Sequence, residues 1–148
     1  MLRYINIKSR DNARTPMQWD DSVNAGFSEH EPWIKINPNY TEINAKEQIS
    51  RESSVFNYYK NLIKLRKNNP IMVYGIYELL LEDSKEIYAY TRTLDDKKLL
   101  VVCNFTKEFV KFDMPEEFVN GKILVRNYEN SDIPTDGLKP YESIVIEI

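Results

Sequence analysis

The second half of the sequence alternates between short apolar segments and polar turns. Residues 77–82, 87–93, 99–105, 109–112, 123–128 and 143–148 are each rich in the β-branched or aromatic side chains that favour strands. Polar turns separate these segments at residues 82–85, 95–98, 120–121 and 135–137. Because hardly any helical pattern lies between the strands, their spacing favours an antiparallel β-sandwich over a parallel sheet.

One amphipathic helix is predicted over residues 54–69, and Ser53 or Ser54 is suited to cap its first free N–H groups. Pro70 ends the helix, because proline disfavours helical geometry in the residue before it. One stripe of the helix, at steps of three and four residues, is apolar except for Arg66 at its end. Its members are Val55, Tyr59, Leu62, Ile63 and Arg66, with Phe56 and Leu65 at its edges. Such a stripe needs a partner surface, so self-association of the chain is one expectation.

Residues 1–52 show no hydrophobic period and are repeatedly interrupted by residues that break regular structure. Prolines and a glycine interrupt this stretch at Pro16, Gly26, Pro32 and Pro38. A loop of this length is uncommon inside a compact domain unless it is functional or lies against a scaffold. We therefore predict a loop that packs on a host structure, with the boundary to the strand-rich region near residues 70–75.

The composition excludes several classes of protein. The chain has 148 residues, 42% hydrophobic, and a formal net charge of -3, so it favours neither nucleic acid nor an anionic membrane as a partner. No apolar run approaches the roughly 20 residues of a membrane span, and the first ten residues lack the pattern of a secretory signal. A single cysteine fits a reducing compartment, so we expect a cytoplasmic protein.

Few residues are candidates for catalysis or for binding a metal or cofactor. Asp11, Asp20 and Asp21 could form an acid/base pair, but neighbouring loop aspartates more often face solvent, cap turns or pair with arginine. His30 has no second histidine or cysteine at ligand spacing, so no metal site is predicted. Cys103 lies in an apolar strand, where a thiol behaves as a small hydrophobe. Glycine-rich phosphate loops are absent, and no cofactor is predicted.

Two arginines and two tryptophans suggest a binding surface instead. Arg10 and Arg14 each carry five N–H donors in a rigid fork, which can hold a carboxylate and still donate to hydroxyl groups. Trp19 and Trp33 provide flat faces for a sugar ring. A polyol-binding pocket and a loop that only fixes its own backbone are both compatible with these residues.

Several motifs resemble a known family. The run SRDNARTPMQWD at residues 9–20 is followed by NAGF at 24–27, PWIKINPNY at 32–40 and INAKEQ at 43–48. Together with LIKLRKNNP at 62–70 and the segments YGIYELLL, IYAYTRT and LLVVCNF, these motifs resemble the C-terminal part of oligo-1,6-glucosidases and related α-glucosidases. Those enzymes belong to the α-amylase superfamily of glycoside hydrolases, and the resemblance covers essentially the whole chain.

The resemblance implies an α+β fragment in which the end of a (β/α)8 barrel precedes an antiparallel β-sandwich, domain C. Residues 1–70 would be the last loop and helices of the catalytic barrel, and residues 71–148 would be domain C. The loop would then lie at the C-terminal face of the barrel, where the substrate sites of this fold are built. By the same resemblance, Arg14 lines the glucose pocket, Arg10 and Asp11 shape the loop, and Asn12 is a weaker candidate for substrate contact.

The family's three catalytic carboxyl groups lie on earlier barrel strands, and none of their motifs occurs here. We therefore expect this chain to be inactive alone, while its parent hydrolyses α-1,6 or related links in short gluco-oligosaccharides. Its partners would be that substrate and the missing N-terminal barrel. An alternative is a standalone noncatalytic β-sandwich that binds carbohydrate or a protein.

Overall fold

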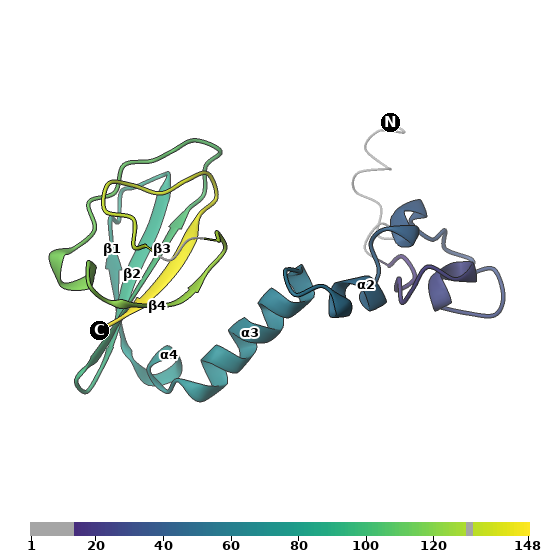
Figure 1. Ribbon diagram of the computed structural model, residues 1–148, viewed down its shortest axis with the longest axis horizontal. Helices are drawn as coiled ribbons and strands as arrows, with labels where there is room; N and C mark the ends of the chain where they lie inside the picture. The colour runs from purple at the N-terminus through teal and green to yellow at the C-terminus, as the bar shows by residue number, and fades with distance from the viewer. Residues whose placement is uncertain (1–13, 130–131) are drawn as a thin grey trace. The chain divides into compact units, whose positions relative to one another are not determined.

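The computed structural model describes residues 14–129 and 132–148. The chain divides into two compact units, Met1–Asn61 and Leu62–Ile148. Figure 1 shows the short helices of the first unit and the sheet of the second, with helix α3 running through the boundary between them. None of the helices in the described ranges has the length and apolar character needed to traverse a lipid bilayer.

The first unit combines irregular chain with short helical turns. Two 3-10 turns, η2 (Val23–Gly26) and η3 (Pro38–Thr41), precede helix α2 (Ala45–Ser50). Helix α2 differs from the uninterrupted loop expected for residues 1–52. Its six residues are too few to show a hydrophobic period, so capping by Asn44 is the local signal that marks it.

Helix α3 (Val55–Asn68) confirms the predicted amphipathic helix. Of the two serines considered as its cap, Ser54 takes the role, because its Oγ accepts from the N–H of Asn57 at 3.1 Å. None of its residues is buried, and Val55, Tyr59 and Ile63 are 79%, 64% and 44% exposed. The apolar stripe thus lacks a covering surface within the described residues.

The second unit is built on one antiparallel sheet, which confirms the predicted antiparallel β-domain. Its strands are β1 (Ile76–Leu80), β2 (Ile87–Leu94), β3 (Lys97–Asn104), β4 (Lys122–Arg126) and β5 (Ser143–Glu147), preceded by the short helix α4 (Ile71–Tyr74). The strand order is β1-β2-β3-β5-β4, with every neighbouring pair antiparallel (Figure 1). The segment predicted as a strand at 109–112 makes one isolated bridge, from Val110 to Leu138.

The core lies between one face of this sheet and an irregular second layer. The sheet contributes Ile87, Ala89, Leu100, Val102, Ile144 and Ile146, and the connecting segments contribute Phe112, Met114, Phe118 and Leu138. Burial of these apolar side chains is the main favourable term for folding, at about 25 cal/mol per Å². The two layers fit a β-sandwich-type C-terminal domain in which the second layer has little regular pairing.

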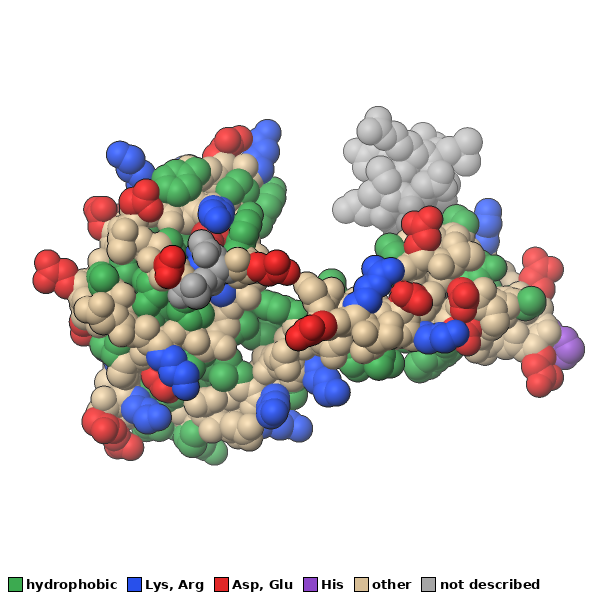
Figure 2. Space-filling view, viewed as in Figure 1, with side chains coloured by type: hydrophobic (Ala, Val, Ile, Leu, Met, Phe, Trp, Pro, Cys, Tyr) green, Lys and Arg blue, Asp and Glu red, His purple; other side chains and the backbone are tan. Residues whose placement is uncertain are grey.

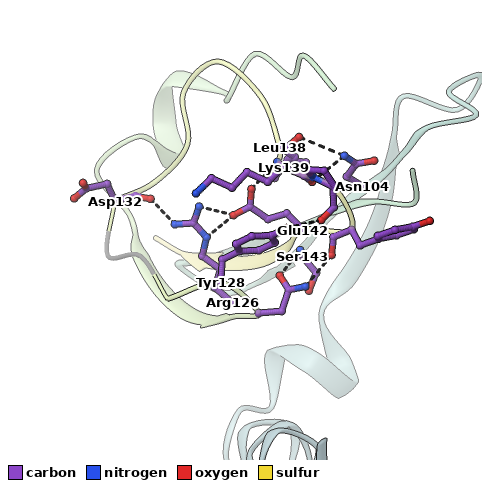
Figure 3. A network of polar contacts seen from close by, with 11 residues as sticks. Asn104, Arg126, Tyr128, Asp132, Leu138, Lys139, Glu142 and Ser143 are labelled. Atoms are coloured by element: carbon purple, nitrogen blue, oxygen red, sulfur yellow. Dashed lines mark hydrogen bonds and ion pairs between the residues drawn. The ribbon is translucent and has the colours of Figure 1, made fainter. Parts of the chain in front are cut away.

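A buried ion pair ties this second layer to the sheet. The guanidinium of Arg126 donates to the carboxylate of Glu142, with Nε 2.6 Å from Oε1, and both side chains are at most 5% exposed. The other carboxylate oxygen of Glu142 accepts from the N–H of Lys139 at 2.8 Å, and Arg126 also donates to the carbonyl of Asp132 at 2.7 Å (Figure 3). Charge pairing and hydrogen bonds together offset the cost of removing both groups from water.

Candidate functional site

Among the four residues predicted to contact substrate or shape its loop, the structure describes Arg14 alone. Arg14 is exposed, and it makes no ion pair with another described residue. Arg10, Asp11 and Asn12 lie outside the described residues. The described part of the site therefore consists of residues 14–20, the second half of the SRDNARTPMQWD motif, and the residues that contact them.

Asp20 organises a tight turn directly after Trp19. Its Oδ1 accepts from the backbone N–H of Ser22 at 2.9 Å and from the Ser22 hydroxyl at 2.5 Å. These two hydrogen bonds, with a smaller contribution from the charge of Lys46, lower the pKa of the Asp20 carboxyl. Asp20 is therefore an ionised acceptor at neutral pH and is unsuited to donate a proton.

The same turn contains three consecutive residues in the left-handed region, Asn24, Ala25 and Gly26, with φ of 56°, 57° and 65°. The carbonyl of the fully buried Ala25 accepts from the N–H groups of Trp19 and Asp20, at 2.9 and 3.2 Å. A Cβ at Gly26 would lie 2.8 Å from Oδ1 of Asp20. Both the backbone conformation and the contact with Asp20 therefore favour a glycine at position 26.

Helix α2 holds the other side of the motif. The N–H groups of Ala45 and Lys46 donate to the carbonyls of Gln18 and Trp19, at 2.9 and 3.0 Å. The Gln18 side chain donates to Oδ1 of Asn39 and to the carbonyl of Ile43, at 3.0 and 2.6 Å. Residues 18–20 are therefore fixed on both sides by hydrogen bonds from their backbone and from the Gln18 side chain.

Asn44 is a structural residue of the site that the sequence analysis missed. It is 3% exposed, its Oδ1 caps α2 by accepting from the N–H of Glu47 at 2.9 Å, and its Nδ2 donates to the carbonyl of Tyr40. The available signal was an asparagine followed three residues later by glutamate, which is the pattern of a helix start.

Large apolar side chains lie at the surface of this unit. Met17, Trp19 and Phe27 are 49%, 53% and 47% exposed, and Trp33 is 89% exposed. Figure 2 shows hydrophobic side chains at the surface of both units, among charged ones. An exposed indole suits contact with the apolar face of a sugar ring.

The remaining candidates for catalysis or metal binding do not form a common site. Asp21 forms an exposed ion pair with Lys46 at 3.6 Å, and His30 is exposed. Cys103 is half-buried on β3, and burial raises the pKa of its thiol, as expected for a small hydrophobic residue. Over residues 14–129 and 132–148, no group of acidic, histidine or cysteine side chains is arranged to hold a metal ion.

The chain matches two family descriptions, one on each side of residues 76–86. "Alpha amylase, catalytic domain" matches residues 1–75, and "Alpha-amylase SusG C-terminal domain" matches residues 87–145. The first match spans half of the chain. The chain therefore belongs to the α-amylase family of glycoside hydrolases.

Curated relatives match nearly the whole of this chain. It is 51% identical to the oligo-1,6-glucosidase of Bacillus cereus over 100% of its residues, which is 27% of that protein. It is 47% identical to the oligo-1,6-glucosidase of Parageobacillus thermoglucosidasius, again over 27% of its length. The trehalose-6-phosphate hydrolase of Bacillus subtilis is 39% identical over 97% of the chain.

Solved structures agree with this assignment. Trehalose-6-phosphate hydrolase of Bacillus licheniformis superposes with a TM-score of 0.87 at 42% identity, over 99% of this chain and 27% of that one. Isomaltulose synthase of Klebsiella superposes with a TM-score of 0.85, also at 42% identity, over 94% of this chain and 26% of that one. The chain thus spans about a quarter of the length of these relatives.

Proposed function

We propose that this chain is the C-terminal part of a retaining α-glucosidase that hydrolyses α-1,6 or related links in short gluco-oligosaccharides. The observation that carries the proposal is the match to oligo-1,6-glucosidase at 51% identity over the whole chain but only 27% of the relative. In this proposal residues 1–70 complete a catalytic barrel, residues 71–148 form its C-terminal domain, and the cytoplasm is the compartment.

The chain contributes recognition, and the missing barrel contributes the chemistry. A retaining glycosidase needs two carboxyl groups about 5 Å apart, one of them with a raised pKa. Asp20 has a lowered pKa, and Asp21 is paired with Lys46. We assign Arg14, with Arg10, Asp11 and Asn12, to one wall of the glucose pocket.

The uncovered apolar stripe of α3 supports the proposal that most of the barrel is missing from this chain. Val55, Tyr59 and Ile63 are exposed although they share the apolar side of the helix. In the intact enzyme, this stripe would pack on neighbouring helices of the barrel, which is the arrangement that an amphipathic helix requires. In the isolated chain it would instead favour association between copies.

A chimera tests the proposal directly. The matched 27% of the Bacillus cereus oligo-1,6-glucosidase is replaced by this chain, and isomaltose hydrolysis is measured for the chimera and for the isolated chain. We expect hydrolysis by the chimera and none by the isolated chain. Hydrolysis by the isolated chain, or a folded chimera that is inactive, would contradict the proposal.

The second candidate function is a noncatalytic carbohydrate-binding module. Three tyrosines, Tyr77, Tyr88 and Tyr90, cluster on the sheet, and the first two are 45% and 43% exposed. Isothermal titration of the isolated chain with isomaltose and maltose separates the two candidates. Millimolar or tighter binding favours the module, and its absence favours the enzyme fragment.

A further inference from the structure

One Asn-Gly pair occurs in the chain, Asn120–Gly121, and it lies between the 3-10 turn η4 (Glu116–Phe118) and strand β4. The side chain of Asn120 is exposed and makes no hydrogen bond with any residue in the described ranges. Its amide is therefore accessible to water and is not held by the fold. An accessible amide followed by a glycine is the arrangement in which asparagine, a thermolabile residue, is chemically least durable.

Deamidation of such a pair needs only water as a reactant. The backbone nitrogen of Gly121 loses its proton and attacks Cγ of Asn120, so that a new C–N bond closes a succinimide ring and the side-chain nitrogen leaves as ammonia. Water then opens the ring at either carbonyl carbon, which gives aspartate or, with the main chain rerouted through the side chain, isoaspartate. Nothing is oxidised or reduced. Glycine favours the first step because it has no Cβ to hinder its nitrogen or to restrict its backbone.

The folded turn opposes the first step at the attacking nitrogen. The N–H of Gly121 donates to the carbonyl of Phe118 at 3.0 Å. A proton held in this hydrogen bond is harder to remove, because its removal leaves the carbonyl without a donor. Phe118 is fully buried in the core, and its own N–H donates to the carbonyl of Pro115 at 2.8 Å. The acceptor of the Gly121 N–H is therefore fixed in place.

Close packing opposes the same step at the backbone. A Cβ at Gly121 would lie 2.5 Å from Cγ2 of Ile146 and 3.0 Å from the carbonyl oxygen of Glu147, so the glycine lies directly against β5. The next residue, Lys122, is paired with Glu147 in the β4–β5 ladder. The peptide between Asn120 and Gly121 can therefore rotate toward the Asn120 side chain only when this contact opens.

We propose that Asn120 is a deamidation site that the folded turn protects, and that it reacts when β4 separates from the sheet. β4 is an edge strand in the order β1-β2-β3-β5-β4, and its pairing with β5 shifts register between Ile123 and Val125. Such a shift disrupts the ladder locally, and opening one edge breaks fewer contacts than global unfolding. Deamidation thus records the opening of this edge as a permanent chemical change, whatever reaction the parent protein catalyses.

The two products of deamidation have different effects on the fold. Aspartate at position 120 adds a charge to an exposed side chain and leaves the main chain unaltered. Isoaspartate adds a methylene to the main chain directly before Gly121, where the close contacts with Ile146 and Glu147 leave no room for a displaced backbone. It also moves the N–H of Gly121 away from the carbonyl of Phe118. Isoaspartate therefore prevents β4 from returning to the sheet and makes the opening irreversible.

The rate of deamidation tests the protection. The chain and a synthetic peptide of residues 114–125 are incubated separately in mildly alkaline buffer, and the deamidated fraction at Asn120 is followed by peptide mass spectrometry. We expect the chain to react at least about tenfold more slowly than the peptide, because only its open fraction reacts. In urea that unfolds the chain, the two rates should converge. Equal rates in native buffer, or no reaction at Asn120 in urea, would overturn the inference.

Amide hydrogen exchange identifies the opening that exposes the site. The N–H of Gly121 and the deamidation of Asn120 both require that the hydrogen bond to Phe118 breaks, so the fold should slow both by the same factor relative to the peptide. Val102 is fully buried on the central strand β3, and its N–H should be protected further because it exchanges through global unfolding. Deamidation that is suppressed as strongly as exchange at Val102, and more strongly than exchange at Gly121, would overturn the inference.

Two variants at one position separate the reaction from its consequence. Asn120→Gln keeps an amide on a longer side chain that closes a ring less readily, so this variant should still refold after incubation in urea. The unsubstituted chain treated in the same way should refold in lower yield, with isoaspartate enriched in the material that fails to refold.

Asn120→Asp is the matched control for charge, because it carries the acid on an unaltered main chain. Its melting temperature should equal that of the unsubstituted chain, since the side chain at this position is exposed. An equal loss of refolding in Asn120→Gln, or a melting temperature as low in Asn120→Asp as in the chain that carries isoaspartate, would overturn the inference.

Discussion

A single glycine stabilises the turn beside Trp19. Gly26 has a φ of 65°, and a side chain there would meet the carboxylate of Asp20. We expect Gly26→Ala to destabilise the first unit by about 1–3 kcal/mol, the usual cost of a strained backbone conformation. Both tryptophans, Trp19 and Trp33, lie in this unit, so urea unfolding followed by tryptophan fluorescence measures it. An unchanged unfolding midpoint would contradict this account of the turn.

The ion pair between Arg126 and Glu142 predicts a strongly asymmetric response to mutation. Arg126→Met leaves a buried carboxylate without its cation and should cost about 3–5 kcal/mol. Adding Glu142→Leu removes that unpaired charge and should recover part of the loss, although the N–H of Lys139 then loses its acceptor. Urea unfolding followed by circular dichroism measures both variants. A double variant that is as unstable as the single one would contradict this prediction.

The hydroxyl pair of Tyr77 and Tyr88 makes stability depend on pH in the alkaline range. The hydrogen bond to Tyr88, followed by desolvation, raises the pKa of Tyr77 to about 12. Because an unfolded tyrosine titrates near pH 10, this contribution is fully present below about pH 10 and is lost as the pH rises toward 12. Tyr88→Phe should return the Tyr77 pKa toward its ordinary value, as measured by NMR titration of ring-labelled tyrosine. An unshifted Tyr77 titration in that variant would contradict the assigned cause.

At the scale of elements, the cap of α3 offers a matched pair of variants. Ser54→Ala removes the acceptor for the N–H of Asn57 and the donor to the carbonyl of Gln48 at 2.6 Å. We expect it to cost about 1 kcal/mol, as is typical for loss of an N-cap. Ser53→Ala is the control, because Ser53 is exposed and lies outside the cap. Equal effects in thermal unfolding would show that the cap at Ser54 contributes nothing.

Elements with a clear hydrophobic period were predictable, and elements fixed by distant contacts were not. The helix at 55–68 and the five strands agree with their predicted positions within a few residues, because period and turn signals are local. The segment at 109–112 forms one bridge, to Leu138, and the partner stretch lies between Pro134 and Pro140, which cannot donate to a ladder. The left-handed turn at 24–26 has nearby partners in Asp20 and Ser22, but no hydrophobic period indicates it.

The candidate site was predictable only in part, for a similar reason. Arg14 and Trp19 stand out by residue type, and the family resemblance supplied the suggested role of Arg14. Gln18 acts through partners at Asn39 and Ile43, which are 21 and 25 residues away. No local pattern encodes contacts at that separation, so only the structure identifies the residues that hold the motif.

At the scale of the whole enzyme, Arg14 is the residue whose removal should harm activity most. In the chimera with the Bacillus cereus barrel, Arg14→Ala removes a charged hydrogen-bond donor from the proposed glucose pocket. Charged hydrogen bonds contribute about 1.5–3 kcal/mol, so kcat/KM for isomaltose should fall by about 10-fold to 100-fold.

The control for this loss is another arginine of the same unit. Arg51 forms an exposed ion pair with Glu47 at 3.3 Å, and such surface pairs contribute at most about 1 kcal/mol. Arg51→Ala should therefore leave kcat/KM unchanged, while both variants keep the melting temperature of the chimera. An unchanged kcat/KM in Arg14→Ala would remove Arg14 from the pocket, and the loop would then serve only to shape its own backbone.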